Sequence, residues 1–449
     1  MSFIVGYFEK ILFHFDKLEE PRSEEITKLH RKHFSILLLV SSVDLNLGRK
    51  YLFWTLLHAV FNYVVLAAQT CVLMYSTFLL RNDFEIGSGV LNYGLLMIVA
   101  IGILMNMQYF RHEVLHISGI MCTGLFRYSD KTMETEDMIK FRKHMKFQRQ
   151  LLIALAVYVA TIGGIVVLGP IIDEKLGMGF DGTFDENGVN RRLPVPLNYP
   201  GIDTSKIFGF LLALGMIFQS GVETTLIYGG ATLLFATACQ FILTEMKTLS
   251  VSIQTIPHRA AKKYCRIHNV SKKSLDLKTI FDDSEFQDCI TDCLKENIQH
   301  YLEIYKFTKV LETYVKVPLL LAVLVITLAI GLTMMKLNED IVRIGATISF
   351  TSVALGELCI MFLIAVYGEY YLTMSQEVNW EIYFTPWYKF SVKNQKLIRQ
   401  FLISTRNELC IFAWIVRMDM EMFASVMNSA YSFFNFLNIS KTLEEDELN

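Results

Sequence analysis

The chain has 449 residues, of which 53% are hydrophobic and 19% charged, with a net charge of −2 and a mean hydropathy of +0.37. This composition is too apolar for a soluble globular protein of that length. The nearly neutral charge and the lack of a basic tract give no support for nucleic-acid binding.

Apolar stretches long enough to cross a bilayer, which takes about 20 residues, recur along the chain. Residues 1–50 mix acids with bases and lack the pattern of a signal peptide, so they are predicted to be a non-spanning N-terminal segment. The predicted spans, in chain order, are residues 52–80, 88–110, 151–172, 207–243, 317–335, 344–367 and 420–438. The expected fold class is therefore an all-α integral membrane protein with seven transmembrane helices.

The last apolar region is interrupted by three charged residues, Arg417, Asp419 and Glu421. This break predicts that the last helix is split into an amphipathic anchor part and a short spanning part. The expected organisation is an N-terminal segment at 1–50, a six-helix bundle at 51–392, an anchor helix at 393–416, a spanning helix at 417–438 and a tail at 439–449.

The distribution of Lys and Arg predicts the orientation, because cytoplasmic connections carry more of them. Residues 1–50 and 111–150 each carry eight and residues 244–316 carry twelve, whereas residues 173–206 carry four. The N-terminus is therefore predicted to be cytoplasmic and the C-terminus extracellular. This topology is inverted relative to a G-protein-coupled receptor.

The cysteines and a sequon agree with this orientation. None of the eight cysteines lies in a loop that is predicted to be outside, so no disulfide is expected there. Asn269 begins an Asn-Val-Ser sequon, but it lies in a predicted cytoplasmic connection and is expected to stay unglycosylated.

Enzyme chemistry receives little support from the sequence. No phosphate-binding glycine loop, zinc-protease motif or serine nucleophile motif is present, and no catalytic residue or cofactor is expected. Cys289 and Cys293 have helical spacing, but no second ligand pair lies nearby, so a metal site is not favoured. Glu223 and Glu357 are ionisable residues inside predicted spans, where they either act functionally or hydrogen-bond within the bundle.

The final helix carries a polar stripe at spacings of four, three, four and three residues. Its members are Glu421, Ser425, Asn428, Ser432 and Asn435. Such a stripe has two interpretations. It forms hydrogen bonds between helices inside one bundle, or it lines a water-filled pore between subunits. In the pore interpretation, Asn435 and Phe436 are the candidate constriction.

The C-terminal third of the chain resembles the insect odorant receptors. The resemblance rests on Gly368-Glu369 followed by Glu377, on Tyr383-x-x-Pro386-Trp387-Tyr388, and on the segment Ala430-Tyr431-Ser432-Phe433-Phe434. It implies an odorant-gated cation channel in the plasma membrane of a sensory neuron, in which the last helix of each of four subunits lines the pore. It also implies a tuning-type subunit that assembles with co-receptor subunits or with itself. The alternatives are a gustatory-type channel, a G-protein-coupled receptor and a transporter.

The same resemblance implies a ligand site in the outer half of the bundle, between helices two, three, four and six. A small apolar volatile would be held there mainly by burial. The candidate contact residues are Tyr93, Met97, Tyr158, Ile162, Phe208, Phe210, Leu214, Thr347 and Phe350.

Overall fold

The chain folds into long helices and one short hairpin. The computed structural model describes residues 52–81, 83–129, 184–269, 280–337 and 344–448, together with scattered positions between 150 and 177. The long helices are α3 (Leu52–Leu79), α4 (Phe84–Tyr109), α7 (Ile207–Gln254), α9 (Ser284–Leu337), α10 (Ile344–Phe384) and α12 (Met420–Leu448). The shorter elements are α5 (Arg111–Thr123), α8 (Ile256–His268), η3 (Ile280–Asp282), η4 (Trp387–Lys389), α11 (Val392–Thr405), β1 (Phe412–Ala413) and β2 (Val416–Arg417).

Among the described residues, five helical segments are long and apolar enough to cross a membrane. They are Val60–Leu79, Ile86–Tyr109, Ile207–Gln254, Ser284–Met334 and Ile344–Lys389. These segments coincide with the first, second, fourth, fifth and sixth predicted spans. The predicted N-terminal segment and most of the third span lie outside the described residues. Helix α12 is not among the five, because its polar stripe lowers its mean hydropathy.

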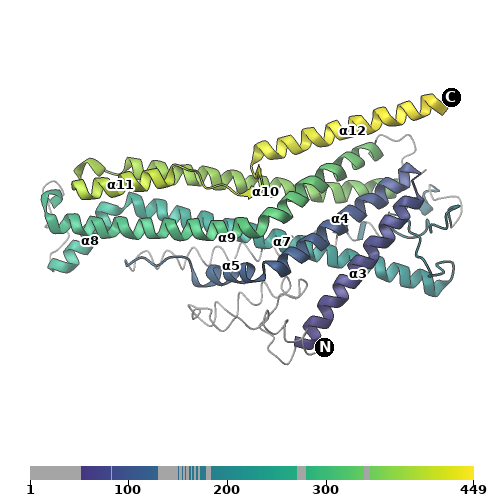
Figure 1. The fold of residues 1–449 in the computed structure, drawn as a ribbon, viewed down its shortest axis with the longest axis horizontal. Helices are drawn as coiled ribbons and strands as arrows, with labels where there is room; N and C mark the ends of the chain where they lie inside the picture. Colours follow the sequence, from purple (N-terminus) through teal and green to yellow (C-terminus); the bar gives the residue numbers. More distant parts are fainter. Residues whose placement is uncertain are drawn as a thin grey trace.

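Helices α7, α9 and α10 extend far beyond the thickness of a bilayer. The 54 residues of α9 correspond to roughly 80 Å of helix, against a hydrocarbon core of about 30 Å. Helices α8 and α11 pack against one end of α9 (Figure 1). We call this end, which includes the adjoining turns of α7 and α10, the packed end. The opposite half of the bundle, where α3 and α4 lie, is the cavity end.

The packed end is held together by polar side chains that are buried in pairs. The Arg259 guanidinium donates to Glu296 and, at 3.1 Å, to Asn297 Oδ1, and it lies 4.7 Å from the centre of the Tyr128 ring. His300 is fully buried, with Tyr128 Oη 2.7 Å from its Nδ1 and Glu245 Oε2 3.0 Å from its Nε2. Breaking such a network costs more than breaking surface pairs, because each remaining partner stays desolvated.

A second polar contact joins α8 to the residue that precedes α9. The Tyr264 hydroxyl donates to Asp283 Oδ2 over 2.5 Å. This hydrogen bond raises the pKa of Tyr264 to about 12 and lowers the pKa of Asp283 below its ordinary value. The contact therefore favours the ionised carboxylate and the neutral phenol.

Helix α9 contains a proline at its centre, and α4 compensates for it. Pro318 has no N–H, so the carbonyl of Tyr314, four residues earlier, loses its helical partner. The side-chain amide of the buried Asn106 on α4 donates to this carbonyl over 2.9 Å. The bond fixes the position of α4 against the proline turn of α9.

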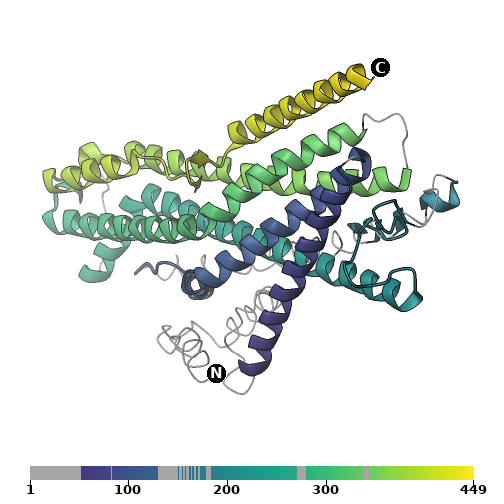
Figure 2. The same ribbon diagram turned by 45° about the vertical axis from the view of Figure 1, so that its right-hand side comes forward.

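Helix α12 is joined to the bundle at its first turn. Gly368 of α10 approaches the chain so closely that an added Cβ would lie 1.6 Å from the carbonyl oxygen of Met418. Asp419 caps the helix by accepting from the backbone N–H of Met422 over 2.8 Å. From this point α12 runs along the edge of the bundle, and its C-terminal end lies away from the other helices (Figures 1 and 2).

The boundaries of the two C-terminal segments differ from the predicted ones. The helix predicted at 393–416 ends at Thr405, and a hairpin (β1–β2) follows, in which Trp414 adopts a left-handed conformation. The helix predicted to end at 438 continues to Leu448, through most of the predicted tail. Hydropathy locates the end of an apolar run, whereas a polar sequence of helix-forming residues lets the helix itself continue.

Candidate ligand cavity and polar helix face

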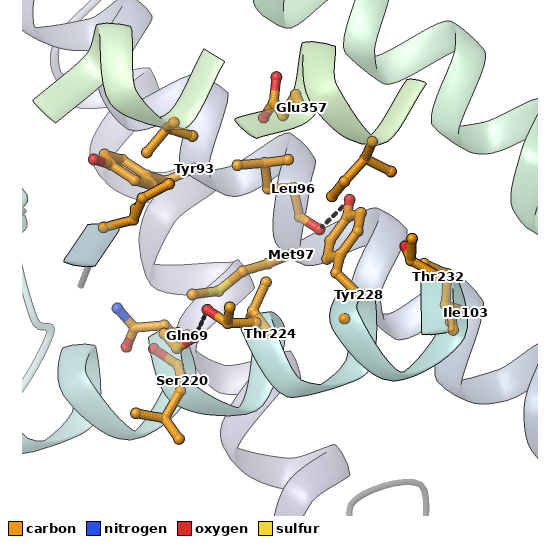
Figure 3. A pocket seen from close by; sticks show the side chains of 18 of the residues that line it. Gln69, Tyr93, Leu96, Met97, Ile103, Ser220, Thr224, Tyr228, Thr232 and Glu357 are labelled. Atoms are coloured by element: carbon orange, nitrogen blue, oxygen red, sulfur yellow. Dashed lines mark hydrogen bonds between the residues drawn. The ribbon is translucent and has the colours of Figure 1, made fainter. Parts of the chain in front are cut away.

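A cavity of about 730 Å³ lies within the helix bundle, between α3, α4, α7, α9 and α10 (Figure 3). Its wall is formed largely by leucine, isoleucine, valine and aromatic side chains of these helices. Pro194 and Val195, from the connection that precedes α7, also line it. A cavity of this size and lining fits a small, mainly apolar ligand.

A few polar groups interrupt the apolar wall, and two of them are fixed by hydrogen bonds. Gln69 Oε1 accepts from the buried Tyr199 hydroxyl over 3.0 Å. The Tyr228 hydroxyl donates to the Leu96 carbonyl over 3.2 Å, which ties α7 to α4 (Figure 3). These bonds hold the polar groups in defined positions before any ligand enters.

Glu357, unlike Gln69 and Tyr228, is not held by a hydrogen bond to a described residue. Its side chain belongs to α10, lines the cavity and is only 7% exposed. Within the part of the chain that the structure describes, neither carboxyl oxygen has a hydrogen-bond partner. Glu223, the other buried glutamate that was expected within a span, accepts from Gln219 over 2.6 Å and does not line the cavity.

The predicted ligand contacts divide into two groups. Tyr93, Met97, Ile162 and Leu214 line the cavity, whereas Tyr158 lies outside the described residues. The side chains of Phe208, Phe210, Thr347 and Phe350 are not part of its wall.

Their positions explain why the second group is separate. The cavity reaches α7 at Leu211, so Phe208 lies beyond its edge and is 79% exposed. Phe210 packs against an apolar cluster at the cavity end that includes the wall residues Leu73 and Met97, but its own side chain is not part of the wall. Phe350 packs against Tyr93, with the ring centres 5.8 Å apart and the ring planes tilted by 41°, and so supports the wall without forming it.

Tyr228, Tyr314 and Glu357 line the cavity at positions that the predicted contact set did not include. That set was restricted to the outer half of the bundle, whereas the cavity continues deeper, toward Tyr314 and Ile364. The ionisable character of Glu357 was the one sequence signal that pointed to this deeper region.

The polar stripe on α12 is directed away from the rest of the chain. Met422, Val426 and Ala430 form the buried face of this helix. Of the predicted pore residues, Glu421, Ser425, Asn428, Ser432 and Phe436 are exposed, and Asn435 is half-buried. The hydroxyl of Ser432 bonds to the carbonyl of Asn428 in its own helix. Among the described residues, no hydrogen bond joins the stripe to α9 or α10.

The cysteine pair and the sequon both lie at the packed end. Cys289 and Cys293 are buried on α9, and the described residues contain no group of three or more side chains suited to a metal ion. Asn269 ends α8 in the left-handed conformation, with φ of 52°. This residue therefore has a structural role as the helix cap.

Comparison with known families identifies the class of this membrane protein. The family model described as "7tm Odorant receptor" matches residues 125–431. The chain belongs to the odorant receptor family. Its described residues include five helices suited to crossing a membrane, so it is a multi-pass membrane protein of a receptor family.

Two solved structures share the fold of this odorant receptor. Both are of the insect olfactory receptor OR5 from Machilis hrabei, one of them in complex with eugenol. The eugenol complex gives a TM-score of 0.69 and covers 93% of this chain and 100% of the other. The second structure gives 0.70, with 92% and 98% coverage. At 9% sequence identity in both cases, the likeness establishes the fold. No curated protein matches the sequence.

Proposed function

We propose that this odorant receptor is a tuning-type subunit of an odorant-gated cation channel. A small volatile binds in the cavity and favours one packing of the helices. The chain assembles as a tetramer, with itself or with co-receptor subunits, and α12 of each subunit faces a common pore. Seven helices cross the plasma membrane of the sensory neuron, with the N-terminus in the cytoplasm and the C-terminus outside.

The exposed polar face of α12 is the observation that carries this proposal. Serine and asparagine side chains that face lipid gain no hydrogen bonds from it, so a polar stripe in a membrane faces protein or water. The stripe is directed away from the helices of its own chain. Copies of α12 around a symmetry axis would instead enclose it in a water-filled path.

The charges at the start of α12 support a preference for cations. Glu421 is exposed at the first turn, and Asp419 is held beside it by Arg417. Rings of such carboxylates from several subunits raise the local concentration of cations at a pore entrance. On the proposed topology this entrance lies on the cytoplasmic side.

Whole-cell current recording tests the channel. Cells that express the chain, with and without a co-receptor, receive a pulse of mixed volatiles while G-protein signalling is blocked. We expect a fast inward cation current whose ion selectivity changes in Asn435→Ala. Met427→Leu, on the half-buried side of the same helix, is the control and should keep the wild-type selectivity. A surface-expressed chain without current in either setting would contradict the proposal.

The proposed topology has a separate test at Asn269. On this topology the sequon at Asn269 faces the cytosol, whereas the Asn438-Ile439-Ser440 sequon lies toward the outside, so Asn269→Gln should leave the mobility of the mature protein unchanged. A glycan on Asn269 would place the packed end outside the cell and would reverse the orientation.

A further inference from the structure

The described part of the cavity wall contains one acidic side chain, Glu357. Over the described part of the wall, no lysine, arginine or histidine accompanies Glu357. Among the described residues none donates a hydrogen bond to its carboxyl oxygens, although the side chain is 93% buried. A buried carboxyl in this state is costly, and an occupant that supplies a positive charge or a donor relieves the cost.

Two tyrosines lie beside this carboxyl. Figure 3 shows Glu357 with Tyr93 on one side and Tyr228 on the other. Both tyrosines line the same cavity as the carboxyl. Tyrosine rings attract cations through their electron-rich faces, so rings and carboxyl together favour a positive charge at this position.

From this arrangement we propose that the receptor binds a small amine, held in its protonated form against Glu357. The proposal rests on the proposed function, because it assumes that this cavity is the ligand site. The ammonium group pairs with the carboxylate between Tyr93 and Tyr228, and the apolar part of the ligand fills the leucine- and isoleucine-rich space that remains. A charge-assisted hydrogen bond in an apolar cavity then decides which ligands are preferred.

An uncharged ligand satisfies the site less well. An alcohol of the same shape can donate one hydrogen bond to Glu357, but it supplies no positive charge to form an ion pair with the ionised carboxylate. A hydrocarbon of the same shape leaves both oxygens without partners. The site should therefore rank amine, alcohol and hydrocarbon in that order.

Ligand binding to the purified full-length protein in lipid nanodiscs tests the proposal without requiring current. Thermal unfolding is followed with increasing 2-phenylethylamine, 2-phenylethanol or propylbenzene, because a ligand of the native state raises the unfolding temperature. We expect the amine to bind the wild type at least about tenfold more tightly than the alcohol, the difference that one charged contact supplies.

Two substitutions separate the role of the carboxylate from a general effect of buried glutamates. Glu357→Gln should bind amine and alcohol equally. Glu223→Gln removes another buried carboxylate, one that lies outside the cavity wall, and should keep the preference for the amine. If Glu357→Gln does not fold, the ranking of the three ligands on the wild type decides the matter alone.

The outcomes separate this inference from the proposed function. Equal binding of amine and alcohol to the wild type, or an amine preference that survives in Glu357→Gln, would overturn the inference. Amine binding without any current would support the inference and contradict the channel. Currents evoked by uncharged volatiles, with no preference for the amine, would leave the channel standing and overturn the inference.

Discussion

At the packed end Arg259 and His300 are buried with partners on neighbouring helices, whereas at the cavity end Glu357 is buried with no hydrogen-bond partner among the described residues. The difference shows in the packing too. The packed end brings short helices against α9, while the cavity end leaves an open volume of about 730 Å³ between longer ones. Paired polar groups fix the arrangement of the helices that carry them, whereas an unpaired buried group leaves a position that a ligand can satisfy.

The contact between α10 and the start of α12 is expected to be the most sensitive point between these regions. Gly368→Ala would place a Cβ 1.6 Å from the Met418 carbonyl oxygen, so one backbone must move. We expect a loss of more than about 3 kcal/mol, enough to remove most folded receptor from the cell surface. Gly221→Ala, where nothing lies within 4 Å, is the control and should express normally. Equal surface expression of both variants would contradict the observed packing.

The buried ion pair between Arg259 and Glu296 is expected to stabilise the packed end. Arg259→Ala leaves Glu296 without its partner, and we expect about 3–5 kcal/mol of destabilisation in thermal unfolding. Lys263→Ala is a matched control on the same helix, because its pair with Asp292 is 35% and 50% exposed and is expected to contribute about 0–1 kcal/mol. Similar losses for the two variants would show that burial of the network does not determine its contribution.

The link between α4 and the proline turn of α9 should have an intermediate effect. Asn106→Leu removes the donor to the Tyr314 carbonyl and is expected to cost about 1–3 kcal/mol in unfolding measurements. Asn92→Leu, also buried on α4, removes a side chain whose Oδ1 has no partner. This control should be neutral or stabilising, and a loss equal to that of Asn106→Leu would argue against the carbonyl contact.

Two side chains of α7 test where the ligand binds at the cavity end. Leu214→Ala removes apolar wall and should raise the half-maximal ligand concentration about tenfold, equivalent to roughly 1.4 kcal/mol of lost burial. Phe208→Ala removes a larger side chain that is 79% exposed and should leave dose–response curves nearly unchanged. A larger shift for Phe208→Ala would move the ligand site to the end of α7.

The smallest effect is expected at Asp283. Hydrogen bonding to Tyr264 lowers the pKa of this carboxyl, so the folded state binds its proton more weakly than the unfolded state does. The stabilisation is therefore present above the ordinary pKa of 3.8 and is lost as the pH falls through the lower folded-state value. The difference in unfolding temperature between wild type and Asp283→Asn should be present at pH 6 and vanish at low pH. A difference that does not change with pH would rule out this coupling.

The sequence predicts the apolar helices of this protein well and their ends less well. A run such as 344–367 is visible from hydropathy alone, because lipid demands about 20 apolar residues. Hydropathy does not reveal that α10 continues to Phe384, because the added turns pack against protein, where apolar and polar residues alternate. The hairpin at Phe412–Arg417 was missed, since its two-residue strands give no periodic signal.

The cavity lining is predictable only in part, because it depends on how the helices are placed relative to one another. Met97 and Leu214 could be selected because soft side chains in the outer half of a span are suited to apolar ligands. Tyr228 and Tyr314 could not, since the depth of a cavity depends on how far apart the helices stand. The contact of Asn106 with the Tyr314 carbonyl joins positions 208 residues apart, and no local pattern encodes it.

A bend of α9 at Pro318 would move the part of this helix that contacts α12. Pro318 forms part of the cavity wall, and Gly331, farther along the same helix, lies against Phe433 and the Ala430 carbonyl of α12. At 1.5 Å per residue the two positions are about 20 Å apart, so each degree of bending at Pro318 moves Gly331 sideways by roughly 0.3 Å. A rotation of about three degrees would thus displace the α9 surface that contacts α12 by about 1 Å.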